Sequence, residues 1–190
     1  MAARGKFSMK RAPVELTEYD PGWPAKFEAE KSILMETIGE WFFGRVEHVG
    51  STAVPGLVAK PIIDIMFGVK SLEASRPAID VRVRNGYEYS PYKTAVMYWF
   101  CKPSDAFRTH HLHLIPFASL LWHERIKFHD LLRLDPALAN EYAALKKQLT
   151  ARYRQDRETY TEQNCPLSNV SLNAARSASG RLRASSKTGG

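Results

Sequence analysis

Apolar residues near the start of the chain recur at the three- and four-residue spacing of a helix. They are Trp23, Phe27, Leu34, Ile38 and Trp41, with charged residues between them. The turn residues Asp20-Pro21-Gly22 come just before the first of them, and Pro24 falls in the first turn. This pattern predicts a helix that begins after 20–22 and ends at Gly44.

Strand patterns follow this helix. Residues 45–49 form a short candidate strand, and residues 61–69 are an almost unbroken run of Ile, Met, Phe and Val. A run of this kind is typical of a central strand that is covered on both faces. We expect the second strand to lie in the middle of a sheet.

The rest of the chain alternates between the two patterns. We expect helices over 71–84, 119–134 and 136–163, and strands over 86–90, 95–102 and 109–116. This order lacks the strict strand-helix alternation of a doubly wound fold. The sequence therefore predicts an α/β chain of the α+β kind, with helices packed on a mixed sheet.

Charge and composition divide the chain into a body and two tails. The net charge is +7, but residues 1–12 and 165–190 each hold four basic side chains and no acid, which leaves the body, 13–164, close to neutral. We expect one domain over 13–164, a basic N-terminal tail over 1–12, and a disordered, Ser/Ala/Gly-rich tail over 165–190. A nucleic-acid partner is not expected, because the excess charge belongs to the tails.

The cysteine and hydropathy patterns bear on the compartment. Cys101 and Cys165 lie in unrelated contexts without a CxxC motif, so a disulfide framework is not expected. No stretch approaches about 18 uninterrupted apolar residues, and the basic N-terminus lacks the apolar run of a secretory signal. We expect no membrane partner and a cytoplasmic location.

The first candidate site is the turn between the two early strands. Gly50 allows a close backbone approach, and its amides with the hydroxyls of Ser51 and Thr52 can hold phosphate oxygens, although an ordinary turn can have the same sequence. Asp64 follows inside the apolar strand, where a carboxylate is costly unless it is paired or bound to metal. The alternative is an acid paired with Lys60 or with Arg108. Lys60 itself either neutralises phosphate or is simply exposed.

The second candidate site is the histidine-rich strand that follows Arg108. His111 and His113 share one face of this strand and His110 points to the other. Two imidazoles at this spacing can ligate a divalent metal or hold a phosphate. Either Glu47 or His48, on the first strand, can face the same site.

Several of these motifs resemble the GrpB family (UPF0157). The similarity spans roughly 13–163, and its longest motif is HVGSTAVPGLVAKPIIDI over 48–65. Other matching segments are Val14-Glu15-Leu16, Tyr19-Asp20-Pro21-Gly22-Trp23-Pro24, Arg108-Thr109-His110-His111-Leu112-His113 and the helix with Trp122, Phe128 and Asp130. The resemblance implies a nucleotidyltransferase-like fold of the DNA-polymerase-β type, found alone or fused to dephospho-CoA kinase.

The resemblance also implies roles for the site residues. Asp64 would be catalytic, and together with His111 and His113 it would hold a divalent metal, Mg²⁺ first and Mn²⁺ or Zn²⁺ as alternatives. The phosphates of a nucleoside triphosphate would lie on Gly50, Ser51, Thr52, Lys60 and Arg108. Two hypotheses follow: nucleotidyl transfer to a small-molecule acceptor, or a non-catalytic nucleotide- or metabolite-binding or folding-accessory module. The second arises because Met66 stands where nucleotidyltransferases carry a second acid.

Overall fold

The computed structural model describes residues 12–164, and the predicted tails lie outside these residues apart from Ala12. Its centre is a mixed sheet with the strand order β1-β2-β5-β4-β3. The strands are β1 (Phe42–Val49), β2 (Ile63–Val69), β3 (Glu88–Ser90), β4 (Tyr98–Pro103) and β5 (Arg108–Pro116). The pair β2–β5 is parallel and the other pairs are antiparallel. The predicted α+β class with a mixed sheet is confirmed.

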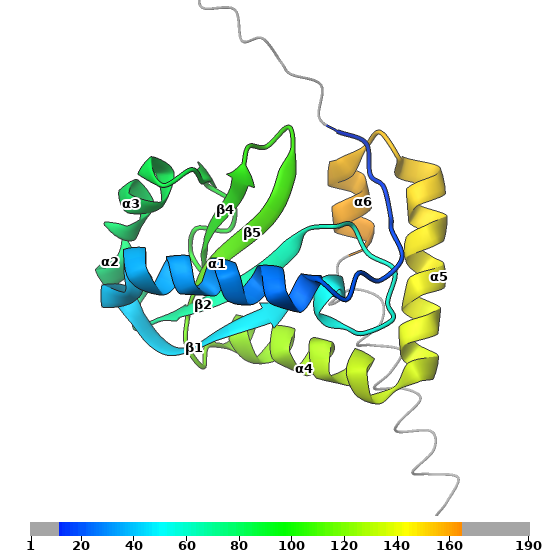
Figure 1. Cartoon of the computed structure of the whole chain (residues 1–190), viewed down its shortest axis with the longest axis horizontal. Helices are drawn as coiled ribbons and strands as arrows, with labels where there is room; N and C mark the ends of the chain where they lie inside the picture. The colour runs from blue at the N-terminus through cyan, green and yellow to red at the C-terminus, as the bar shows by residue number, and fades with distance from the viewer. Residues whose placement is uncertain (1–11, 165–190) are drawn as a thin grey trace, which may run out of the picture.

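Helices lie against this sheet (Figure 1). They are α1 (Trp23–Ile38), α2 (Leu72–Ser75), α3 (Ala78–Arg84), α4 (Leu120–Leu134), α5 (Pro136–Tyr153) and α6 (Arg157–Gln163), with short 3-10 turns η1 (Gly39–Trp41) and η2 (Ser51–Ala53). Figure 1 shows α1 crossing in front of β1 and β2, and α5 rising from the end of α4. Within residues 12–164, no helix has the length and apolarity needed to cross a membrane.

The two faces of β2 pack into separate hydrophobic clusters. Ile63, Ile65 and Phe67 lie in the main core, together with Trp23, Phe27, Leu34 and Ile38 of α1. Met66 points the other way and packs with Val49, Ile115 and Trp122 of α4. Because successive strand residues alternate between faces, a strand covered on both sides needs apolar residues at every position. The prediction that 61–69 forms a central strand is confirmed, with β2 beginning at Ile63.

The first helix ends earlier than its sequence pattern predicts. α1 stops at Ile38, one turn of 3-10 helix follows, and β1 begins at Phe42. Gly44, predicted as the helix terminus, lies instead at an irregularity of β1 with φ of 87°. A Cβ on Gly44 would overlap the Phe117 ring, so this position needs glycine for packing as well as for its backbone.

Two predicted helices are each divided in the structure. The predicted helix 71–84 is interrupted at Pro77, which lacks the N–H needed inside a helix and serves as the N-cap of α3. The predicted helix 136–163 breaks at 154–156, where the Asp156 side chain accepts the amide of Thr159 and starts α6. Each break redirects the chain, and the second one brings α6 back toward the sheet.

Candidate functional site

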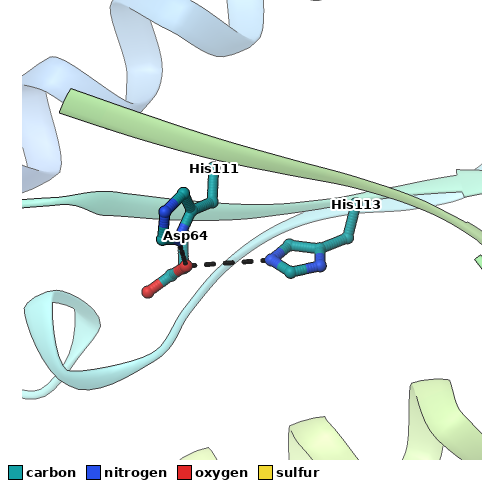
Figure 2. A group of neighbouring side chains, drawn as sticks. All are labelled: Asp64, His111 and His113. Atoms are coloured by element: carbon teal, nitrogen blue, oxygen red, sulfur yellow. Dashed lines mark hydrogen bonds and ion pairs between the residues drawn. The ribbon is translucent and has the colours of Figure 1, made fainter. Parts of the chain in front are cut away.

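The centre of the candidate site is a carboxylate flanked by two imidazoles. In the parallel register of β2 and β5, Asp64 lies opposite His111, and Met66 lies opposite His113. Asp64 Oδ1 is 2.8 Å from His111 Nδ1 and 3.7 Å from His113 Nε2. Figure 2 shows both rings directed at this one oxygen. The alternation of side chains on β5 and its pairing with β2 thus bring together the three residues that were predicted to be metal ligands.

The exposure of the three side chains is unequal. Asp64 keeps 29% of its side-chain surface exposed, whereas His111 and His113 keep 12% and 8%. The carboxylate therefore stands at the mouth of the site, and the rings form its inner wall. One donor atom from each residue lies within 4.8 Å of the other two, close enough to surround a metal ion.

Burial sets the protonation of this group. It lowers the pKa of His113 to about 3, with Arg125 of α4 adding to the effect. It also lowers the pKa of His111, against the attraction of Asp64. Burial alone would raise the pKa of Asp64, but the two histidines outweigh it and hold that pKa below its ordinary value. At neutral pH the group is one carboxylate and two neutral imidazoles, which is the protonation state that metal ligands require.

The three donors fit a divalent ion. Two imidazole nitrogens and one carboxylate oxygen suit Mn²⁺ or Zn²⁺, whereas Mg²⁺ prefers a set made of oxygens. His111 Nε2 and His113 Nδ1 are buried and have no hydrogen-bond partner among the described residues. These nitrogens can carry the ring protons once the inward-facing nitrogens bind a metal. The donor set is therefore compatible with the expected divalent cofactor.

The other candidates on these strands lie apart from this group. Glu47 shares the face of Asp64, but its carboxylate pairs with Arg45 at 3.3 Å. His48 lies on the α1 face, where it stacks on the Phe27 ring with centroids 4.9 Å apart. His110 also points to that face, with Nδ1 2.9 Å from the Thr109 hydroxyl. The structure brings none of these three side chains to Asp64.

The turn before η2 lies directly on Asp64. Gly50 has φ of 72°, and a Cβ added there would come within 2.5 Å of Asp64 Oδ2. The hydroxyls of Ser51 and Thr52 have different surroundings. Thr52 is buried, donates to the Ile62 carbonyl at 3.2 Å and receives His48 Nε2 at 3.0 Å. Ser51 is half-buried and accepts from Lys146 Nζ at 2.9 Å. Of the two side chains, Ser51 is the one available to a ligand.

Neither of the two predicted cations forms an ion pair with the Asp64 carboxylate, although Lys60 lies within reach of its charge. Burial lowers the pKa of Lys60 to about 8, Asp64 opposes the shift, and Lys60 Nζ lies 4.8 Å from the centre of the Tyr160 ring. Arg108 pairs with Asp105 and lies over the Trp99 ring. The alternative in which Asp64 pairs with Lys60 or Arg108 is wrong, because the two histidines take that place.

Lys146 of α5 is a site residue that the sequence reasoning missed. It is 1% exposed, and its ammonium donates to Ser51 and to the Val58 carbonyl. Burial and the nearby charge of Lys60 lower its pKa to about 7. A signal was present, since Lys146 follows Tyr142 by four residues and so falls on the apolar stripe of its helix.

Comparison with known proteins shows where the chain belongs. A family model described as GrpB protein matches residues 13–170. The glutamate-rich protein GrpB of Alkalihalophilus pseudofirmus is 34% identical over 160 residues, which cover 82% of this chain and 91% of that protein. The crystal structure of conserved protein GrpB from Enterococcus faecalis is similar, with a TM-score of 0.71 and 35% identity, over 78% of this chain and 90% of that chain. A dephospho-CoA kinase of Mycolicibacterium paratuberculosis is 31% identical over 79% of this chain and 43% of its own length. The chain belongs to the GrpB family.

Proposed function

We propose that this protein transfers a nucleotidyl group from a nucleoside triphosphate to a small-molecule acceptor in a metal-dependent reaction. An oxygen of the acceptor attacks the α-phosphorus, the bond from that phosphorus to the β-phosphate oxygen breaks, and pyrophosphate leaves. Chemistry of this type needs positioning and charge stabilisation more than covalent participation by the protein.

One observation carries this proposal: the Gly-Ser turn closes on Asp64, so closely that a Cβ at Gly50 would lie 2.5 Å from Asp64 Oδ2. A turn that can hold phosphate oxygens therefore adjoins three metal donors. Gly50 and Ser51 would bind the β- and γ-phosphates, and Lys60 and Arg108 would offset their charge. Asp64, His111 and His113 would hold Mn²⁺ or Zn²⁺ in preference to Mg²⁺. The bound metal would supply Lewis-acid stabilisation of the phosphate charge.

Met66 favours a second candidate function. Met66 stands two residues after Asp64 and is fully buried in an apolar cluster, where nucleotidyltransferases carry a second acid. A site with one carboxylate can bind a metal-nucleotide complex without transferring it. The likeness to part of a dephospho-CoA kinase fits an accessory module of this kind, attached to a protein that handles nucleotides. This second proposal is a nucleotide- or metabolite-binding module.

The two functions are separated by measuring binding and turnover on the same variants. We expect ATP to bind with Mn²⁺, and Asp64→Asn to weaken this binding at least about tenfold while the far-UV circular dichroism stays unchanged. Asp80→Asn, on the exposed side of α3, is the matched control and should bind as the wild type does. Turnover is measured with α-labelled nucleoside triphosphates and a metabolite extract.

Each result has a defined meaning. Label transferred by the wild type and lost in Asp64→Asn supports the enzyme. Metal-dependent binding without transfer supports the binding module. Equal affinity in the wild type and Asp64→Asn overturns both functions and makes Asp64 a structural partner of the two histidines.

A further inference from the structure

Lys146 is a buried lysine without an acidic partner in the described part of the chain. Its side chain is 1% exposed, and among the described residues no carboxylate pairs with it. Its partners are the Ser51 hydroxyl, the Val58 carbonyl and the Tyr142 ring, whose centre lies 4.8 Å from Nζ. Burying a cation without a counter-ion is expensive. Packing alone does not explain a lysine in this position.

The surroundings add positive charge. Lys60 lies close enough to repel Lys146, and it is itself repelled by Arg157 and Arg108. The acid that attracts Lys60 is Asp64, whose carboxylate is committed once a metal is bound. When both lysines are protonated, they and a divalent ion face one carboxylate, and the net charge is about +3. A ligand with several negative charges close together would neutralise this positive charge.

The hydrogen bonds at Ser51 indicate which of its atoms can contact such a ligand. Lys146 donates to the serine oxygen at 2.9 Å, and the Tyr142 phenol lies beside the same hydroxyl. Burial raises the pKa of Tyr142, so its phenol keeps its proton. With its oxygen accepting from Lys146, Ser51 directs its own hydrogen away from that ammonium. That hydrogen can turn from the Tyr142 oxygen to an anionic oxygen on the side of Gly50 and Asp64.

We infer that Lys146, acting through Ser51 and together with Lys60, makes this turn a subsite for the polyphosphate chain of a ligand. Lys146 is a positioning residue, because Ser51 makes the direct contact. The inference rests on the proposed function in one respect, namely that the polyphosphate runs from this turn toward the metal donors. It extends that function by assigning the subsite to a helix 95 residues away in the sequence.

The pKa of Lys146 gives the subsite a measurable signature. A lysine whose pKa is about 7 is roughly nine-tenths neutral at pH 8. A polyanion favours its charged form, so binding at pH 8 draws a proton from the buffer. The groups facing Lys146 are Ser51 and Lys60 from other elements and Tyr142 from its own helix. Of these, Lys60 shares the effect, since its pKa is about 8.

The experiment uses the full chain and inorganic tripolyphosphate in EDTA, with calorimetry at pH 8 in two buffers of different ionisation enthalpy. We expect Lys146→Met to weaken binding at least about tenfold and to take up fewer protons than the wild type, by a difference approaching about one. Lys147→Met is the matched control, because Lys147 is the exposed neighbour on the same helix. It should change the affinity less than about twofold. Orthophosphate should bind at least about tenfold more weakly than tripolyphosphate.

Ser51→Ala guards the test against misfolding of Lys146→Met, and it should also weaken tripolyphosphate binding. Unchanged affinity in Lys146→Met or in Ser51→Ala overturns the inference, as does equal proton uptake in the wild type and Lys146→Met. Labelling of Ser51 by a fluorophosphonate also overturns it, because a neutral Lys146 would then serve as the base of a serine nucleophile. Tripolyphosphate carries no nucleoside and needs no acceptor. Its binding can therefore succeed while nucleotidyl transfer fails, and the reverse outcome is equally distinct.

Discussion

At the scale of single residues, the site depends on a glycine that has two separate reasons to be a glycine. Gly50 has a positive φ of 72°, which most residues adopt only with strain, and it leaves room for Asp64 Oδ2. Gly56, in the following loop, has a similar φ of 77°, but a Cβ added there would meet nothing within 4 Å. The chain thus contains a second glycine with positive φ at which an added Cβ has no contact.

Replacing Gly50 by alanine should therefore cost more than replacing Gly56. Gly56→Ala carries the backbone penalty alone, about 1 kcal/mol. Gly50→Ala adds the overlap with Asp64, and we expect it to lose a further 1 to 2 kcal/mol or so of unfolding free energy and to weaken metal binding. Urea unfolding and Mn²⁺ titration measure the two effects. Equal losses in both variants would show that Asp64 moves aside freely and that the close approach does not matter.

At the scale of elements, the hydrophobic pattern locates strands better than it locates the ends of helices. β2 and β5 are found because Ile63 to Val69 and Leu112 to Ile115 are covered on both faces, so nearly every side chain carries the signal. The division at Pro77 was also readable, since proline cannot continue a helix. The end of α1 was not, because Trp41 continues the helical spacing after the backbone has left the helix.

In the candidate site, too, the strand residues were predictable from the sequence and the helix residue was not. Asp64 and the two histidines lie on neighbouring strands, and strand alternation correctly places them on one face. Lys146 contacts Ser51 across 95 residues of sequence. No local pattern reports a contact at that separation, and the break at 154–156 that shapes the C-terminal helices was not predicted either.

Helix α1 is tied to the sheet by a buried polar contact as well as by its apolar face. Glu30 is 4% exposed and accepts from the Tyr87 hydroxyl at 2.9 Å and from Lys102 Nζ at 2.8 Å. Arg82 of α3 lies over the same tyrosine ring. This contact joins α1, α3 and β4 on the side of the sheet opposite to the candidate site.

Removing the charge of Glu30 should loosen this contact. Glu30→Gln keeps the shape but leaves the half-buried Lys102 without its anion, and we expect a loss of about 2 kcal/mol in unfolding free energy. Glu28→Gln is the control on the exposed side of α1, where the ion pair with Lys31 is solvated and should contribute well under 1 kcal/mol. Chemical denaturation of the two variants gives the comparison. A loss below that of Glu28→Gln would show that water replaces the carboxylate.

At the scale of the whole molecule, buried histidines make the fold sensitive to acid. Burial lowers the pKa of His48 to about 4 and that of His113 to about 3. Both groups have pKa values near 6.5 in the unfolded chain, so the unfolded state binds more protons between these limits. The stability contributed by the neutral rings is complete above about pH 6.5 and is lost as the pH falls toward 4 and below.

His48→Gln tests this sensitivity at a position apart from the metal donors. The variant loses the stacking on Phe27 and should be less stable than the wild type at pH 7, but it has no group to protonate. Between pH 7 and pH 4.5 we expect the wild type to lose about 2 kcal/mol more than the variant. Urea unfolding at both pH values provides the measurement. Parallel losses in the two proteins would mean that folding does not lower the pKa of His48.

The distance in sequence between Ser51 and Lys146 has a consequence for how the protein is made. A chain growing on the ribosome completes the strand that carries His111 and His113 before α4 and α5 have been synthesised. At that moment Met66, Met97 and Ile115 have no Trp122 to cover them, and an uncovered apolar face invites association with other chains. The same late helices that deliver the buried lysine to the turn also cover this face. The nascent protein therefore covers this apolar face and brings Lys146 to Ser51 in a single late stage of synthesis.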